Sequence, residues 1–220
     1  MTKAEVRTRI EEIGIMPAIR VSASERARFA VEALFRSGIP VAEVTMTVPK
    51  ACDVIAEMSK TIPDMVIGAG TVLDTETARR CLDAGARFLT SPGFVPEVVE
   101  FALKNDVVVF PGAMTPSEVI AAWEAGSDFV KVFPCDALGG HHYIRTLKVP
   151  LPQVKLIASG GVNQQTACDF ILAGASALGI GGQLIPEEAI SKRKEAQIHE
   201  LARRFLSMVK DARTQKENTK

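Results

Sequence analysis

Eight short apolar runs rich in β-branched residues alternate with longer amphipathic segments, and this alternation constrains the fold more than any other feature. The brevity of the runs, several of them apolar throughout, is typical of parallel strands that are covered on both faces. The segments between them have the spacing of surface helices. The predicted strands span residues 16–21, 41–46, 65–69, 88–90, 107–110, 129–133, 155–158 and 177–180.

Start and stop signals bound the predicted helices. Ser22 and Glu25 predict a capping box before a helix over 25–36, and Asp74 and Thr115 predict two further helix starts. Glycine just beyond a helix end supplies the left-handed residue that turns the chain back. Glycines of this kind precede four of the predicted strands, at Gly38, Gly85, Gly126 and Gly174.

The alternation shows no break in composition, so the chain predicts one α/β domain over residues 1–220, a closed (β/α)8 barrel of the TIM-barrel type. Residues 1–14 are expected to form an extra N-terminal helix. The polar residues from about 212 to 220 are expected to be a frayed tail. An open doubly wound sheet is the alternative architecture.

Charge and composition exclude several classes of protein. The 26 Lys and Arg residues balance 26 Asp and Glu residues, which predicts no binding to nucleic acid or to an anionic membrane. No apolar run is long enough to span a membrane, and the N-terminus, with both charge signs, does not resemble a signal peptide. Four scattered cysteines without a CxxC pair are typical of reduced thiols. These features favour a cytoplasmic protein.

Lys131 is the candidate nucleophile. In barrels of this kind the reacting groups gather at the C-terminal ends of the strands. Lys131 interrupts the sixth predicted strand, over 129–133, which ends just before Pro134. Alternation places it on the same face as Phe129 and Phe133. A lysine withdrawn from water is costly to keep charged, and the uncharged amine is the form that attacks a ketone. The alternative is a rim lysine that reaches solvent.

Glu43 raises the same question on the second predicted strand. It shares a face with Thr45 and Thr47, opposite the apolar Val44. A carboxylate that faces the barrel interior is either paired structurally or carries protons during catalysis. With a lysine on another strand, both roles are possible.

Two further features suggest groups that bind anions. Arg20 ends the first strand, where a guanidinium can hold a carboxylate through two parallel hydrogen bonds; the alternative is a surface arginine. Glycine-rich segments follow the seventh and eighth strands, where barrels commonly bind phosphate through backbone N–H groups. These segments contain Ser159, Gly160, Gly161, Gly181 and Gly182.

No metal and no cofactor are predicted. His141 and His142 are adjacent, so they would not face one ion, and no carboxylate cluster accompanies them. The serines lack a histidine partner at any motif spacing, which disfavours a serine hydrolase.

The sequence resembles the 2-keto-3-deoxy-6-phosphogluconate (KDPG)/4-hydroxy-2-oxoglutarate (KHG) aldolase family of class I pyruvate aldolases. The resemblance extends from about Ile15 to the last helix and rests on seven motifs in family order. The motifs are EVTMTVPKA (43–51), GAGTVL (68–73), SPG (91–93), PGAMTPSE (111–118), KVFP (131–134), SGGV (159–162) and GIGG (179–182).

The resemblance implies a role for each candidate residue. Lys131 would form an imine with the C2 ketone of a keto acid, and Glu43 would act as general acid and base through a bound water. Arg20 and Thr71 would hold the keto-acid carboxylate. It further implies a cytoplasmic homotrimer that needs no metal. The imine pocket would be shaped by Thr45, Pro92 and Phe133, and a distal phosphate would be bound at Gly160, Gly161, Gly181 and Gly182.

Two positions depart from the family pattern. Thr47 stands where many relatives carry an arginine for the carboxylate, so Arg20 would have to supply that charge. Gly182 stands where relatives often have a serine that contacts phosphate. The small-molecule substrate therefore stays open between a phosphorylated sugar acid and 4-hydroxy-2-oxoglutarate or another unphosphorylated acid.

Two other functions compete with the aldolase. One is a phosphosugar isomerase or lyase on the same barrel, in which Glu43 is the base and no lysine reacts covalently. The other is a non-catalytic binding protein on an aldolase scaffold. Reduction with borohydride in the presence of pyruvate separates the aldolase from both, because only a Schiff base is trapped.

Overall fold

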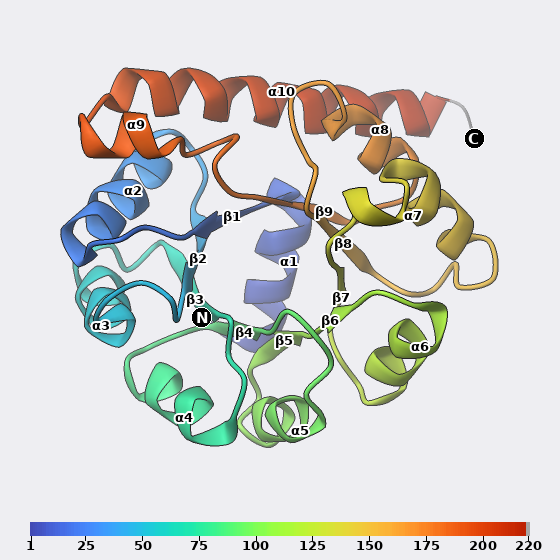
Figure 1. Cartoon of the computed structure of the whole chain (residues 1–220), viewed down its shortest axis with the longest axis horizontal. Coiled ribbons are helices and arrows are strands. Elements are labelled where there is room, and N and C mark those ends of the chain that lie inside the picture. The colour runs from blue at the N-terminus through green and yellow to red at the C-terminus, as the bar shows by residue number, and fades with distance from the viewer. Residues whose placement is uncertain (219–220) are drawn as a thin grey trace.

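Parallel strands form a ring with helices around its outside (Figure 1). The computed structural model describes residues 1–218. The strands are β1 (Ile15–Ile19), β2 (Val41–Thr45), β3 (Val66–Gly70), β4 (Phe88–Thr90), β5 (Val108–Phe110), β6 (Gly112–Ala113), β7 (Val130–Val132), β8 (Leu156–Ser159) and β9 (Ala177–Ile180). The helices are α1 (Lys3–Ile13), α2 (Ser24–Arg36), α3 (Ala51–Thr61), α4 (Thr75–Asp83), α5 (Pro96–Lys104), α6 (Pro116–Glu124), α7 (His141–Lys148), α8 (Ala167–Leu172), α9 (Glu187–Ser191) and α10 (Glu195–Asn218), with a short 3-10 helix η1 (Asp136–Leu138).

The fifth strand of the barrel is divided into two pieces. The sheet order is β5-β4-β3-β2-β1-β9-β8-β7-β6, and only Pro111 separates its two end strands in the chain. Proline has no N–H to donate to a ladder. Its carbonyl still accepts from the backbone N–H of Lys131 at 2.9 Å, which joins this strand to β7. The ring is therefore closed, the predicted (β/α)8 barrel is confirmed, and the open-sheet alternative is wrong.

Two of the three predicted helix starts are confirmed. Asp74 caps α4, and Thr115 forms a capping box at the start of α6. The capping box predicted at Ser22 is wrong, because α2 begins one residue later than that box requires, with Ala23 at the N-cap and no side-chain cap bond. The Ser22 hydroxyl instead accepts a hydrogen bond from Arg26.

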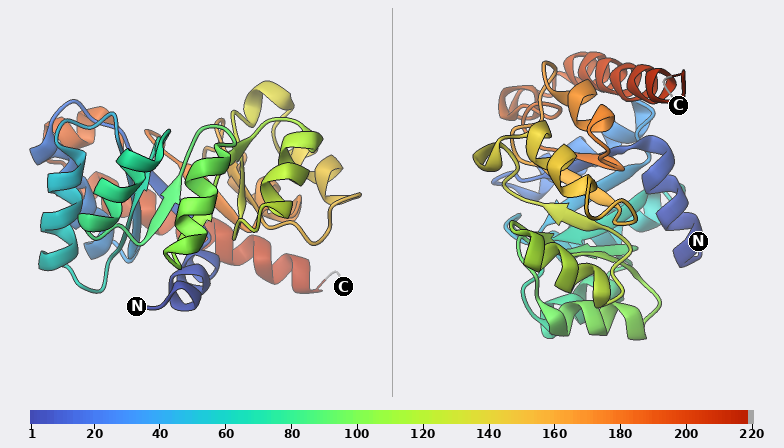
Figure 2. Two further views of the ribbon diagram at one scale, coloured as in Figure 1. Left: turned by 90° about the horizontal axis from the view of Figure 1, so that it is seen from below. Right: turned by 90° about the vertical axis from the view of Figure 1, so that its right-hand side faces the viewer.

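Helix α1 closes one end of the barrel. Figure 2 shows it at that end, outside the ring of strands. Its Val6 and Ile10 are buried and pack with side chains that point into the barrel from the strands. This interior cluster keeps water out of the lower barrel, so polar side chains inside the ring are confined to the opposite end. Its members from the strands are Met16, Val41, Val66, Phe88, Val108, Phe110, Ile157 and Ala177, joined by Phe129 directly before β7.

The C-terminal segment is a helix, so the prediction of a frayed tail from about 212 is wrong for residues 212–218. α10 continues to Asn218, with Ala212 buried against the core. Arg213 donates to the backbone carbonyls of Glu11 and Glu12, which fixes the helix to the end of α1. These contacts outweigh the polar composition of the segment. Residues 219 and 220 lie outside the described residues. Within residues 1–218, no helix combines the length and the apolar character that crossing a membrane requires.

Replacement of Ile10 by alanine tests the contribution of α1. The side chain is fully buried in the interior cluster, so Ile10→Ala should lower the free energy of unfolding by about 2–5 kcal/mol. Urea unfolding followed by circular dichroism measures the change. Thr8→Ala, an exposed position on the same helix, is the control and should change it by less than about 0.5 kcal/mol. Equal effects of the two variants would show that α1 does not close the barrel.

Candidate active site

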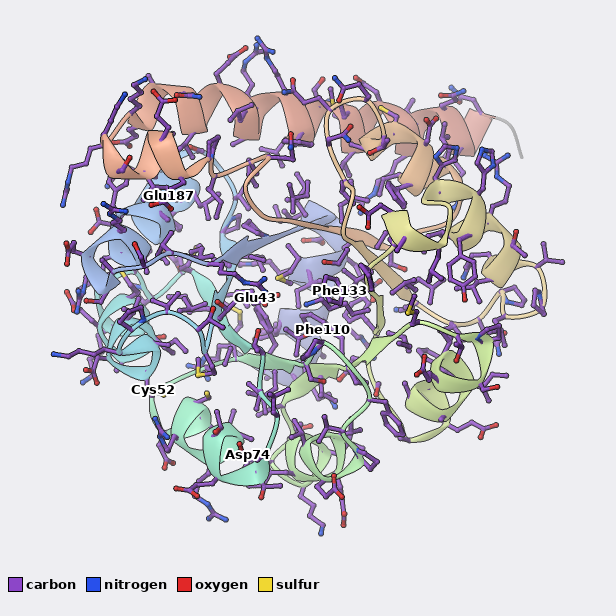
Figure 3. All side chains as sticks on the ribbon, viewed as in Figure 1. Glu43, Cys52, Asp74, Phe110, Phe133 and Glu187 are labelled. Carbon is purple, nitrogen blue, oxygen red and sulfur yellow. The ribbon has the colours of Figure 1, made fainter. Side chains whose placement is uncertain are left out.

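A lysine and a carboxylate meet inside the barrel, above the apolar cluster. Lys131 comes from β7 and Glu43 from β2, and Lys131 Nζ lies 3.8 Å from Glu43 Oε2. Their side chains are only 11% and 3% exposed. Figure 3 shows Glu43 within the ring of strands. The structure thus brings together the candidate nucleophile and the candidate proton carrier, and the alternative of a rim lysine that reaches solvent is wrong.

The end of β2 is fixed by hydroxyl hydrogen bonds. Thr45 is fully buried, and its Oγ1 donates to the carbonyl of Ile19 on the neighbouring strand β1 at 3.1 Å. The same hydroxyl lies 2.7 Å from Oγ1 of Thr47. The register pairs Ala18 with Glu43, so these bonds fix β1 to β2 just above the carboxylate. Thr45 therefore acts on the geometry around Glu43 through the backbone.

Phe133 and Pro92 form part of the surroundings of the lysine in different ways. The ring centroid of Phe133 lies 5.5 Å from Lys131 Nζ, where the ring face favours a cationic nitrogen. The side chain of Pro92 is exposed, and the residue reaches the site through its backbone. Its carbonyl packs so closely on Gly112 that a Cβ there would lie 2.0 Å from the oxygen, and Gly112 is the register partner of Lys131.

Thr71 has a strained backbone directly after β3. Its φ is 60°, in the left-handed region that a β-branched residue rarely adopts. Hydrogen bonds on both sides hold it there: the carbonyl of Gly70 accepts from the N–H of Met46 at 2.8 Å, and the N–H of Val72 donates to the carbonyl of Thr90 at 3.1 Å. Such strain costs about 1–3 kcal/mol and is typical of functional positions.

A pocket of about 400 Å³ opens next to Phe133, and neither Lys131 nor Glu43 is among the residues that line it. Phe133 connects the pocket with the lysine, because it lines the pocket and its ring centroid lies 5.5 Å from Lys131 Nζ. Among the described residues, Arg20 is the only lysine or arginine that lines the pocket, and it is exposed. The glycine-rich segments form the rest of the predicted wall. Six of the predicted residues thus share the pocket with Phe133: Arg20, Ser159, Gly160, Gly161, Gly181 and Gly182.

Sequence reasoning missed the part of this wall that follows β9. Gln183, Ile185 and Glu187 line the pocket, the last from the start of α9. The Glu187 carboxylate is paired with Arg26 at 2.5 Å, which offsets its charge. The preceding Gly181-Gly182 was the available signal, since the residues directly after a glycine-rich strand end share its position at the mouth.

Cys135, two residues beyond Phe133, is unsuited to nucleophilic chemistry, and the described residues offer no cluster of metal ligands. Burial, and then the neighbouring Asp136 carboxylate, raise the pKa of the Cys135 thiol to about 12. Cys135 is therefore a neutral thiol at physiological pH, and a thiol attacks as the thiolate. Across residues 1–218, no three His, Cys, Asp or Glu side chains gather in a way that could hold a metal ion.

Comparison with known proteins places the chain among aldolases. The model of the family described as "KDPG and KHG aldolase" matches residues 6–201. The KHG/KDPG aldolase of Escherichia coli K12 is 33% identical over 190 residues, which cover 86% of this chain and 89% of that protein. The 2-dehydro-3-deoxy-phosphogluconate aldolase of Treponema pallidum is 32% identical over 201 residues, covering 91% and 95%.

A solved structure agrees with these relatives. The KDPG aldolase of Legionella pneumophila, with pyruvate captured at low pH as a covalent carbinolamine intermediate, has a TM-score of 0.83 and 32% identity, and the match covers 90% of this chain and 96% of that one. Fold and site together define a barrel enzyme of the aldolase class, a carbon–carbon lyase that acts on a small-molecule substrate. The chain belongs to the KDPG and KHG aldolase family.

Replacement of Thr71 by glycine tests whether its backbone is strained for function. Glycine adopts positive φ without penalty, so Thr71→Gly should raise the free energy of unfolding by about 1 kcal/mol. If the hydroxyl holds the keto-acid carboxylate, as the family resemblance implies, the variant should also raise KM for the keto acid. Urea unfolding and steady-state kinetics measure the two effects. Thr71→Ser, which keeps the hydroxyl, is the control for KM, and lower stability of Thr71→Gly would contradict the strain.

Proposed function

We propose that this protein is a class I aldolase that uses Lys131 to cleave a 4-hydroxy-2-keto acid reversibly. The substrate is KDPG or 4-hydroxy-2-oxoglutarate, and the products are pyruvate with glyceraldehyde 3-phosphate or glyoxylate. The single observation that carries the proposal is the position of the Lys131 amine, buried and 3.8 Å from the Glu43 carboxylate. The names of the relatives and the captured carbinolamine in the Legionella pneumophila enzyme support it.

The reaction follows from the properties of an amine beside a carboxylate. The uncharged amine of Lys131 attacks the C2 carbonyl and forms a carbinolamine, which loses water to give a protonated imine. When the C4 hydroxyl gives up its proton, the C3–C4 bond breaks and its electron pair moves to the imine nitrogen. The aldehyde leaves, and an enamine of pyruvate remains. Protonation at C3 and hydrolysis then release pyruvate and free lysine.

Glu43 supplies the proton transfers. Carbinolamine formation and dehydration add protons at the C2 oxygen, and cleavage removes one from the C4 hydroxyl, so one carboxylate must act alternately as acid and base. At 3.8 Å from the amine, it is too far for a direct hydrogen bond but within reach through one water. Burial keeps competing solvent away from the enamine.

The remaining predicted residues orient the keto acid. Arg20 and the Thr71 hydroxyl hold its carboxylate, and Arg20 supplies the positive charge because Thr47 is uncharged. Phe133 lies beside the lysine and lines the pocket, so its ring shapes the space that the substrate occupies. Thr45 and Pro92 fix the walls on either side. Ser159 and the glycines of the pocket bind the far end of the substrate.

An isomerase or lyase without a covalent lysine has no specific support. The barrel of 3-hexulose-6-phosphate synthase from Salmonella typhimurium matches with a TM-score of 0.74, but its 17% identity establishes a likeness of fold alone. The relatives with substantial identity carry aldolase names.

We also propose that the enzyme is a cytoplasmic homotrimer. A protein cage designed by fusing symmetric oligomeric domains contains a chain that matches this one with a TM-score of 0.86 and 27% identity, which supports symmetric assembly. Leu73, Met114 and Ile120 are apolar side chains exposed on the monomer that an interface would cover.

The Schiff base is tested by reductive trapping. With pyruvate and borohydride, the wild-type protein should lose activity irreversibly and gain one reduced pyruvate adduct on Lys131, located by peptide mass spectrometry. Lys131→Ala should form no adduct, and its kcat/KM should fall by more than about a thousandfold. Lys104→Ala, which removes an exposed lysine, is the matched control. Absence of an adduct on the wild-type protein would exclude the mechanism.

The choice of substrate is tested at Gly182. An added Cβ there meets no atom within 4 Å, so a serine fits without disturbing the pocket. If the far end of the substrate binds at this position, Gly182→Ser should lower KM for KDPG by about threefold to tenfold, through one hydrogen bond to phosphate. KM for 4-hydroxy-2-oxoglutarate should change less. Gly182→Ala controls for bulk, and equal changes for both substrates would place the phosphate elsewhere.

A further inference from the structure

We propose that Gly70 is a positioning residue, whose missing side chain provides the space in which Glu43 holds its carboxylate beside Lys131. The inference rests on the proposed function, since it assigns Gly70 a part in the same catalytic site. It concerns a residue that makes no polar contact with Lys131 or Glu43 and whose strand position alone suggests no catalytic role.

The register of β2 and β3 shows that the Glu43 side chain leans along the strands. Glu43 is paired with Gly68, and Gly70 is paired with Thr45, two residues closer to the C-terminal ends. The carboxylate nevertheless lies against Gly70: a Cβ built there would be 1.8 Å from Oε1 and 2.3 Å from Cδ of Glu43. The side chain thus extends over the bare backbone of Gly70 toward the end of the barrel where reacting groups gather.

Glu43 could not accommodate a methyl group at residue 70 by a small adjustment. The same Cβ would also lie 2.5 Å from Cγ, so rotation of the terminal carboxylate alone would not relieve the overlap. The side chain would have to leave its present rotamer. Because Glu43 is 2% exposed, that movement would separate a buried carboxylate from Lys131, its partner at 3.8 Å.

The backbone itself does not require glycine at this position. Gly70 is the last residue of β3, is paired in register with Thr45, and does not belong to the glycines with positive φ. Its carbonyl accepts from the N–H of Met46 at 2.8 Å, as a strand residue's would. An alanine could adopt this conformation, so what the position requires is space.

Gly68 provides the matched control. It lies on the same strand and the same face, two residues earlier, and is also buried. The atoms nearest to a Cβ at this position are those of the Phe88 ring, at 2.3 Å and 2.4 Å. Gly68→Ala therefore perturbs the apolar interior, whereas Gly70→Ala perturbs the carboxylate.

The kinetic experiment compares Gly70→Ala, Glu43→Gln and the double variant, with Gly68→Ala alongside. We expect Gly70→Ala to lower kcat for aldol cleavage by about 10²–10⁴-fold, as loss of a general acid–base does, while KM changes much less. The double variant should be no slower than Glu43→Gln alone, because both substitutions act through one group. Gly68→Ala should lower the melting temperature while keeping a wild-type dependence of kcat on pH.

A kcat of Gly70→Ala within about threefold of wild type, or losses that multiply in the double variant, would overturn the proposal. The wild-type adduct on Lys131 keeps the two conclusions separate. If that adduct forms and Gly70→Ala is normal, only the role of Gly70 fails; if it does not form, the aldolase mechanism fails first.

A second measurement covers the possibility that Gly70→Ala does not fold. In a Glu43→Ala background the side chain that would collide is absent, so adding Gly70→Ala should leave the melting temperature unchanged or raise it. In the wild-type background the same substitution should lower it by several degrees or prevent folding. An equal loss in both backgrounds would show that residue 70 needs glycine for reasons unrelated to Glu43.

Discussion

The buried pair of Lys131 and Glu43 is the interaction on which the chemistry of this barrel depends. An amine and a carboxyl group 3.8 Å apart and largely removed from water are costly to desolvate in their charged forms, and their attraction alone does not offset that cost reliably. A pair of apolar residues would occupy the same space at a lower cost in desolvation. The presence of the pair is therefore explained by reactivity. In the proposed mechanism the amine attacks the substrate, and the carboxylate beside it exchanges protons with the substrate.

The rest of the barrel provides the dry and fixed surroundings that this pair needs. Below it, α1 and the interior cluster of apolar strand side chains exclude water from the closed end. Around it, the Thr45 hydroxyl bond to β1 and the Pro111 carbonyl bond to the Lys131 N–H fix the strands that carry the two groups. Above it, Phe133 lies beside the amine and also lines the open pocket. Stability and catalytic geometry thus come from the same contacts.

Features that depend on local periodicity were predictable from the sequence, and those that depend on packing were not. Alternation alone placed Glu43 on the face opposite the apolar Val44, and Lys131 on one face with Phe129 and Phe133, since a strand has only two faces. The continuation of the fifth strand past Pro111 through Lys131 and the extension of α10 through Arg213 depend on partners far away in the chain. The close approach of Glu43 to Gly70 depends on the direction in which the Glu43 side chain leans, because strand pairing predicts Gly68 as its neighbour.

The charges around the pocket explain why the sequence left the substrate open. Glu187 is paired with Arg26, which leaves Arg20 as the only unpaired cation that lines the pocket among the described residues. If Arg20 holds the keto-acid carboxylate, the opposite end of the substrate meets backbone dipoles near Gly161 and Gly182 instead of a second full charge. Backbone N–H groups bind phosphate and carboxylate oxygens alike. Discrimination between a phosphorylated and a dicarboxylic keto acid must then come from length and shape along the pocket, which strand-end motifs do not encode.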